Sequence, residues 1–254
     1  MILSARNQKK LEEVQKGLGV GSRAAVLPLD LEQLDTLPVA CATAEKLFGR
    51  VDILVNNGGI STRALARETA LTVDERLMRV NHLAQVALAK CVLPGMTARR
   101  EGHIVTVSSV AGKIGANLRS AYSASKFAVL GFFDALRMEE LEHGISITNV
   151  LPGSVQTDVC KNALDGNGRP LGASDDEIDN GLTVSRTASL VTGAVWMRLD
   201  EVWIAKNPQL LFLYLMQYCP TCARGLQKLL AKKMELKTMA AIERNKKATK
   251  AKET

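Results

Sequence analysis

Short apolar runs alternate with longer amphipathic segments along most of the chain. The runs have the length of buried strands, and the segments between them have helical periodicity. Strands are therefore predicted at residues 2–5, 24–30, 51–55, 101–109, 144–153 and 200–205. Strands that alternate with helices predict βαβ units. The expected fold class is α/β, with a doubly wound parallel sheet.

Four amphipathic segments are predicted to be helices, at residues 7–18, 74–98, 121–143 and 185–199. Gly144 follows the third segment and is expected to cap its end, because glycine readily adopts the left-handed conformation found there. Ser185 is the expected N-cap of the fourth.

The 254 residues suffice for one large α/β domain, and the charge separates a tail from it. From Arg224 to Thr254 there are ten lysines and arginines against three glutamates, which accounts for the whole net charge of +7. We expect residues 1–206 to form the domain and residues 207–254 to form an apolar helix and a basic tail. The longest apolar stretch, at 210–216, is too short to span a bilayer, and no signal peptide is visible.

The C-terminal segment has two interpretations that the sequence leaves open. It could be a packed helix followed by a disordered lysine tail, or a membrane-surface contact made by apolar and basic residues together. Nucleic acid is not an expected partner, because no aromatic residues are interleaved with the basic ones.

No metal site or disulfide framework is expected. The five cysteines, at 41, 91, 160, 219 and 222, are scattered and odd in number. Cys219 and Cys222 form a CxxC pair, but no second pair or histidine cluster completes a zinc site, so they are interpreted as thiols in an apolar helix. The three histidines, at 82, 103 and 143, have no metal-ligand spacing and are interpreted as structural or solvated.

Candidate chemistry centres on Tyr122 and Lys126. Residues four apart on a helix share one face, with side chains rooted roughly 5 to 6 Å apart. A nearby ammonium favours the ionised form of a phenol, which suits the pair to acid/base work. Ser109 lies thirteen residues earlier, where the strand at 101–109 ends. Open α/β sheets bind ligands at that edge.

These residues resemble the motifs of the short-chain dehydrogenase/reductases. Further matches are Asn56-Asn-Gly-Gly59, Asn81, Pro152-Gly153 and Thr157, and all the motifs follow the family's order over residues 2 to about 205. The C-terminal stretch 200–221 resembles their retinal short-chain dehydrogenase branch. The resemblance implies a Rossmann-like fold, and reaction between carbonyls and alcohols on apolar substrates such as retinoids, steroids or xenobiotic carbonyls.

The resemblance also assigns roles to the catalytic candidates. Tyr122 would donate a proton to the substrate carbonyl in reduction, or accept one in alcohol oxidation. Lys126 would make Tyr122 more acidic and bind the nicotinamide ribose. Ser109 would hydrogen-bond the substrate oxygen. Asn81 would hold a water that extends the proton relay.

The cofactor implied is NADP(H). Arg6, directly after the first strand, occupies the place where relatives that prefer NADP put a basic residue against the 2′-phosphate. Asp30 matches the acidic residue that contacts the adenine amino group, and Asn56 and Gly58 lie where backbone approaches the cofactor. Tyr122 and Lys126 would also contact the cofactor. Pro152, Gly153 and Thr157 resemble the motif around the carboxamide, and residues 158–184 would form a mobile loop over the substrate.

One feature departs from the family pattern. Relatives begin with a strand and a glycine-rich turn that holds the pyrophosphate, and we find no counterpart, so the first βα unit is expected to be missing. Gly17-Leu-Gly19-Val-Gly21 is not a substitute, because it follows a helix and precedes a strand. The missing strand would lie between those at 2–5 and 51–55. Those two strands should therefore close up, or the first two strands should detach.

Two hypotheses on function follow from this. The chain is an active enzyme, or it is a catalytically silent, N-terminally truncated isoform that binds no cofactor and acts through dimerisation. The helices at 74–98 and 121–143 would form a homodimer, as in the family. By resemblance the location is the endoplasmic reticulum membrane. The sequence shows no anchor or signal of its own, which leaves a cytoplasmic location as the alternative.

Overall fold

The computed structural model describes residues 1–253, and within them the strands form two separate parallel sheets. The smaller sheet pairs β1 (Ile2–Leu3) with β2 (Ala25–Val26). The larger sheet has the order β3 (Ile53–Asn56), β4 (Gly102–Val107), β5 (Ile145–Pro152) and β6 (Glu201–Ile204). Every strand pair in both sheets is parallel, so the predicted α/β class is confirmed.

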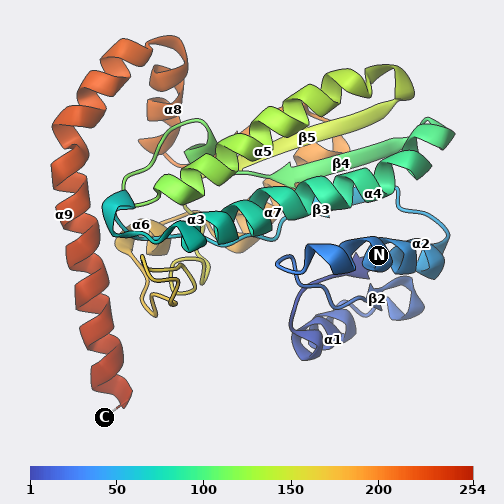
Figure 1. Ribbon diagram of the computed structural model, residues 1–254, viewed down its shortest axis with the longest axis horizontal. Helices are drawn as coiled ribbons and strands as arrows, with labels where there is room; N and C mark the ends of the chain where they lie inside the picture. The colour runs from blue at the N-terminus through green and yellow to red at the C-terminus, as the bar shows by residue number, and fades with distance from the viewer. Residues whose placement is uncertain (254) are drawn as a thin grey trace.

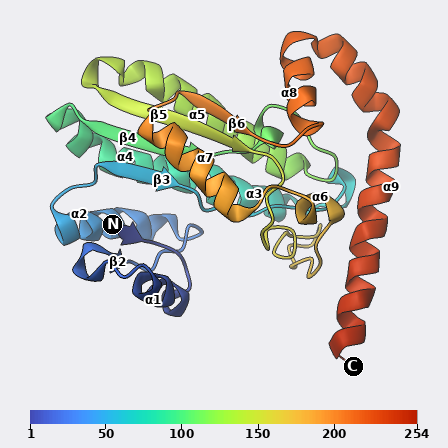
Figure 2. The ribbon, with the colours of Figure 1, turned by 180° about the vertical axis from the view of Figure 1, so that it is seen from behind.

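Helices cover both faces of the larger sheet. Helices α4 (Ala84–Arg99) and α5 (Ser120–Glu139) lie on one face, and α7 (Val184–Trp196) lies on the other (Figures 1 and 2). Met96, Ile104 and Phe133 belong to the core under α4 and α5, whereas Val105 and Val150 pack towards α7. Burial on both faces explains why β4 and β5 do not alternate between buried and exposed positions, so that Thr106, Thr148 and Asn149 are buried together with their apolar neighbours.

The smaller sheet belongs to an N-terminal unit that lies beside the open edge of β3 (Figure 1). This unit contains β1, α1 (Gln8–Gly17), β2 and α2 (Leu37–Phe48), and α2 packs against α4. Strand β3 pairs only with β4 among the described residues, and its Ile53 and Val55 side chains are 50% and 52% exposed. The sequence predicted either that β1 and β3 close up or that the first two strands detach from the sheet. The structure has the second arrangement, with β1 and β2 in a sheet of their own.

Helix boundaries differ from the predicted ones by a few residues. The helix predicted at 74–98 begins earlier, as α3 (Leu71–Met78), and reaches α4 through a π-helical segment, Arg79–Leu83. Gly144, with φ of 70°, caps the 3₁₀ turn that follows α5. The prediction of Ser185 as N-cap is wrong. The Thr183 hydroxyl accepts the Arg186 N–H and caps α7, which places Ser185 inside the first turn.

The C-terminal segment forms two helices beyond β6, α8 (Gln209–Tyr218) and α9 (Pro220–Glu253). Helix α9 runs past the loops at the carboxyl edge of the larger sheet, close to the short α6 (Asp176–Asp179) (Figures 1 and 2). Ala223 and Ile242 of α9 are buried. Among the described residues, no helix combines the length and apolarity needed to cross a bilayer.

Candidate active site

The predicted catalytic residues come from elements that meet at the carboxyl edge of the larger sheet. Ser109 follows β4 within two residues, Asn81 lies in the π-helical segment, and Tyr122 and Lys126 lie in α5. Lys126 Nζ is 5.8 Å from the centroid of the Tyr122 ring, so the two side chains share one face, as their spacing predicts. Tyr122 also packs against Val73 and Leu77 of α3.

Lys126 is held in the interior of the site. Its side chain is 4% exposed, and Nζ donates a hydrogen bond of 2.8 Å to the carbonyl of Val107 at the end of β4. Burial lowers the pKa of Lys126 to about 8, because desolvation penalises the ammonium form. The site therefore contains a cation that loses its proton close to physiological pH.

Lys126 is expected to make the stability of the chain depend on pH. The unfolded chain keeps this proton up to about pH 10.4, whereas the folded chain releases it near pH 8. The unfolded state then binds more protons between these values, so the free energy of unfolding rises with pH, by roughly 3 kcal/mol from this group. Urea unfolding at pH 7.5 and 10 should show the rise in the parent chain and not in Lys126→Met. A Lys126→Met chain with the parent's pH dependence would contradict this assignment. The control is Lys90→Met, which changes an exposed lysine and should keep the parent's pH dependence.

Asn81 joins the loop after β3 to α5. Its Oδ1 accepts the Ile60 N–H at 2.8 Å, and its Nδ2 donates to the Ile60 carbonyl and to Ser125 Oγ, both at 2.9 Å. A Cβ at Gly59 would lie 3.0 Å from Asn81 Oδ1 and 3.5 Å from Lys126 Nζ. Gly59 therefore allows the loop to pass close to both side chains. The π-helical turn, a geometry frequent at functional sites, carries the Asn81 side chain there.

The two serines after β4 have different partners. Ser108 Oγ donates to the Lys126 carbonyl at 2.9 Å and ties α5 to the strand end. Ser109 Oγ donates to the Pro152 carbonyl at 3.3 Å and accepts the Ala111 N–H at 3.1 Å. Ser109 thus faces the end of β5. Within residues 1–253 neither Ser109 nor Asn81 is hydrogen-bonded to the Tyr122 hydroxyl.

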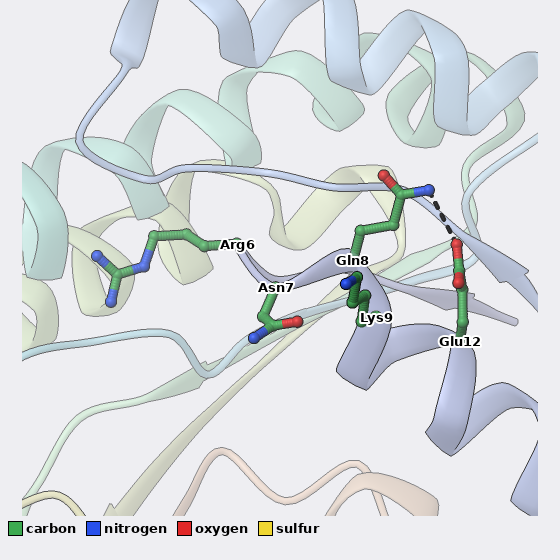
Figure 3. Close-up of a pocket in the computed structure, with 5 residues that line it drawn as sticks. All are labelled: Arg6, Asn7, Gln8, Lys9 and Glu12. Atoms are coloured by element: carbon green, nitrogen blue, oxygen red, sulfur yellow. Dashed lines mark hydrogen bonds between the residues drawn. The ribbon is translucent and has the colours of Figure 1, made fainter.

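Candidates for the adenosine end of a dinucleotide lie in the N-terminal unit. Arg6, together with the start of α1, lines a hollow of about 620 Å³, and the lining residues are Arg6, Asn7, Gln8, Lys9 and Glu12. Figure 3 shows that Arg6 extends away from Gln8 and Glu12, which are hydrogen-bonded to each other at 2.9 Å. The Arg6 guanidinium is 3.9 Å from Glu32 and is largely exposed. Asp30 accepts the Glu32 N–H at 3.0 Å.

An apolar contact joins the end of β3 to this unit. A Cβ at Gly58 would lie 2.5 Å from Leu31 Cδ1, so the loop that carries Asp30 packs against the end of β3. Asn56 is 3% exposed, and its Nδ2 donates to the Gln85 carbonyl at 3.3 Å. Its Oδ1 is buried without a hydrogen-bond partner within the described residues. A buried acceptor without a partner is costly, so Asn56 Oδ1 is positioned to accept a hydrogen bond from a ligand.

The residues after β5 lie on two sides of the next loop. Gly153 is pressed against the start of α8, since a Cβ there would lie 2.5 Å from Gln209 Oε1. Thr157 is exposed and lines a separate hollow of about 450 Å³ on the loop. Pro152 therefore contacts Ser109 directly, whereas Thr157 does not join that group.

The glycine-rich segment at 17–21 is confirmed as a turn that leads from a helix to a strand. It follows α1 and precedes β2, and Gly19 and Gly21 have positive φ. Residues 1–253 thus hold candidate contacts for the adenosine and nicotinamide ends of a dinucleotide. No glycine-rich turn from a strand to a helix for its pyrophosphate lies within them.

A buried charge cluster orders the loop after β5, and sequence reasoning did not find it. Arg63 Nε and Asp175 Oδ2 are 3.0 Å apart, and both side chains are 2% exposed. Arg119 lies 3.6 Å from Asp175 and 3.0 Å from Glu177. Burial raises the pKa of Asp175, but Arg63, the Ile178 N–H and Arg119 outweigh it and hold the pKa below its usual value. The loop predicted to be mobile is anchored by this cluster.

Comparison with known proteins places these observations in a family. The family of short chain dehydrogenases matches residues 1–168. Dehydrogenase/reductase SDR family member 7 of Homo sapiens is 40% identical over 239 residues, which cover 92% of this chain and 70% of the relative. Family member 7B of Mus musculus is 37% identical over 225 residues, covering 87% of this chain and 70% of the relative.

Solved structures show the same fold. A short-chain dehydrogenase from Streptomyces avermitilis, 24% identical, superposes with a TM-score of 0.75 and covers 91% of this chain and 87% of its own. A metagenomic short-chain oxidoreductase in complex with NADP is 27% identical, with a TM-score of 0.61 and coverage of 80% and 83%.

Proposed function

This chain belongs to the short-chain dehydrogenase family, and from that premise we propose that it is an NADP(H)-dependent oxidoreductase that interconverts carbonyls and alcohols. The observation that carries the proposal is that Lys126 lies beside the Tyr122 ring and is hydrogen-bonded to the end of β4, the strand that Ser109 follows within two residues. Each residue has the chemistry that acid/base catalysis on a carbonyl requires.

In the proposed mechanism Tyr122 exchanges the proton with the substrate oxygen. Among the described residues its hydroxyl has no hydrogen-bond partner, which leaves it available to a substrate, and the Lys126 cation lies 5.8 Å from its ring. Ser109 would turn its hydroxyl from the Pro152 carbonyl towards the substrate oxygen and stabilise charge there. Asn81 would support a water relay from Lys126.

The hydride would come from NADP(H), and the chain's own residues would hold this cofactor at three places. Arg6 and Asp30 would contact the adenosine end. Asn56, whose Oδ1 is buried without a partner among the described residues, and Gly58 would contact the middle. Tyr122 and Lys126, with Pro152 and Gly153, would contact the nicotinamide end. The metagenomic relative in complex with NADP supports this choice of cofactor.

The proposed substrates are apolar carbonyls and alcohols, with retinoids, steroids and xenobiotic carbonyls as the classes to test. The experiment follows the loss of NADPH absorbance when the purified chain is given one compound from each class. We expect turnover with at least one class. No turnover with any of them, in a folded chain that binds NADPH, would contradict the proposed substrates.

Arg6 is expected to set the preference between NADP(H) and NAD(H). A charged contact to the 2′-phosphate is worth about 1.5–3 kcal/mol, so Arg6→Asp should weaken NADPH binding roughly 10- to 100-fold. NADH binding should change much less, because NADH lacks the phosphate. Titration of both cofactors measures this preference, and Arg23→Asp, an exposed arginine outside the hollow, is the control. Equal losses for both cofactors would contradict the assignment of Arg6.

We also propose that the C-terminal helices contact an anionic membrane surface, at the endoplasmic reticulum. Leu229 and Leu236 of α9 are 82% and 62% exposed, and Tyr218 at the end of α8 is 79% exposed. Lysines lie among them in the sequence, at positions 228, 232, 233 and 237. Exposed apolar side chains with cations beside them suit the interface of an anionic bilayer.

Vesicle flotation tests this contact. The parent chain should float with vesicles rich in phosphatidylserine, and Leu229→Ser with Leu236→Ser should reduce the floating fraction several-fold. Leu141→Ser, which changes a leucine elsewhere that is 66% exposed, should leave the floating fraction unchanged. Equal flotation of all three chains would contradict the membrane proposal and favour a cytoplasmic location.

A second function is a silent isoform that binds no cofactor and acts through dimerisation. The observation that favours it is the separation of β1 from β3, because it leaves Ile53 and Val55 half exposed at the sheet edge where a dinucleotide crevice would form. The proposed homodimer would use α4 and α5 in either case. Cofactor binding separates the two functions.

A further inference from the structure

The CxxC pair lies at the junction between α8 and α9, not within an apolar helix as the sequence suggested. Cys219 is the C-cap of α8, and Cys222 lies in the first turn of α9, which begins at Pro220. Proline is favoured at the first helical position, so it fixes where α9 starts. Both cysteine side chains are exposed.

The two thiols contact each other. A side-chain hydrogen bond joins Cys219 and Cys222, and this bond, with the charge of Cys219, raises the pKa of Cys222. In such a pair one sulfur keeps its proton while the other reacts. Cys222 lies within the first turn of α9 and its pKa is raised, so it is suited to the second step of an exchange, and we assign the first step to Cys219, which directly precedes that turn.

A second pair of cysteines is also hydrogen-bonded, but it is buried and is not expected to react. Cys41 of α2 is hydrogen-bonded to Cys91 of α4, but Cys41 is 8% exposed, and burial raises its pKa to about 12. A buried thiol of this kind is inert, because the thiolate is the nucleophile. Only the Cys219–Cys222 pair combines contact with exposure among the cysteines of the described residues.

We propose that Cys219 and Cys222 form a reversible dithiol/disulfide pair that reacts with small disulfides such as oxidised glutathione. The Cys219 thiolate attacks one glutathione sulfur, which breaks the S–S bond and releases one glutathione thiolate. Cys222 then loses its proton and attacks Cys219 sulfur, which releases the second. The two cysteines are oxidised, one oxidised glutathione is reduced to two thiols, and the two cysteine protons end on them.

Contacts of α9 connect the Cys219–Cys222 pair to a loop of the active site. In the next turns of α9, Ala223 is fully buried and Gln227 donates a 2.9 Å hydrogen bond to the carbonyl of Gly115. Gly115 belongs to the loop between Ser109 and Tyr122. Closure of a disulfide fixes the torsion angles at the start of α9, and we therefore expect oxidation to change how α9 packs against that loop.

The test uses the full chain in buffers with different ratios of reduced to oxidised glutathione. After an acid quench, free thiols are blocked with N-ethylmaleimide, and tryptic peptides are weighed. Cys219 and Cys222 share the tryptic peptide 207–224, so a disulfide appears as the loss of two hydrogens with no maleimide added. We expect this form to rise with the oxidised fraction and to disappear with dithiothreitol. Cys41 and Cys91 should still react with maleimide after unfolding.

Two variants sharpen the outcome. Cys222→Ser should retain glutathione on Cys219, because the second step is removed, whereas Cys219→Ser should gain much less. Hydrogen exchange at residues 113–119 should differ between the reduced and oxidised parent and not in Cys222→Ser. Full maleimide labelling of both cysteines at every ratio, or oxidation of Cys41 and Cys91 first, would overturn the proposed pair. Unchanged exchange at 113–119 would overturn the link to the active site.

Discussion

Replacement of Tyr122 by phenylalanine is expected to lower turnover about 10²- to 10⁴-fold, the range for loss of a positioned general acid or base. The change removes only the hydroxyl. The Tyr122 ring would keep its packing against Val73 and Leu77, so the folded structure should persist. NADPH oxidation with a carbonyl substrate measures the loss, and thermal unfolding checks the fold.

Tyr218→Phe is the matched control for this prediction. Tyr218 is the last residue of α8, is 79% exposed and stacks on Tyr214 of the same helix. Turnover should match the parent in this variant. Equal turnover in the parent and in Tyr122→Phe would show that the proton comes from another group, and the proposed mechanism would be wrong.

The largest effect on stability is expected for Asp175→Asn. The change leaves the Arg63 guanidinium buried and uncompensated, and loss of one partner of a buried ion pair costs about 3–5 kcal/mol. Asparagine has nearly the same shape and can still accept the Ile178 N–H, which Asp175 now accepts at 2.9 Å. The loss should therefore report on charge. Urea unfolding at pH 7 measures it.

The pH dependence of this difference is a second readout. Because its neighbours lower the pKa of Asp175, the stabilisation is present above the unfolded value of about 3.9 and is lost as pH falls through the folded one. Parent and Asp175→Asn should thus converge in acid. Asp158→Asn breaks an exposed pair with Lys161 and should leave stability unchanged. An equal effect of both variants would contradict the role of the buried cluster.

Much of the larger sheet could be predicted from the sequence because its elements are defined locally. Buried parallel strands such as β4 and β5 give short segments rich in β-branched and other apolar residues, and helices such as α5 give a helical period. The arrangement of the N-terminal unit could not be predicted. Whether β1 pairs with β3 depends on long-range packing, and in the structure α2 docks on α4 while Ile53 and Val55 stay half exposed.

Some residues of the candidate site could likewise be predicted from the sequence, and others could not. Tyr122 and Lys126 could be identified because one helix turn fixes their geometry. The hydrogen bonds of Asn81 to Ile60 and Ser125 depend on a π-helical turn that no sequence pattern indicated. Arg63 and Asp175 are 112 residues apart in sequence, so no local signal connects them.

Binding of NADPH by the purified chain tests the central claim most directly. Energy transfer from Trp196 and Trp203 to the nicotinamide reports binding without any substrate. The proposed function predicts saturable transfer at micromolar NADPH, weakened in Arg6→Asp. A folded chain that gives no transfer at millimolar NADPH would contradict the enzyme assignment and leave the silent isoform as the better account.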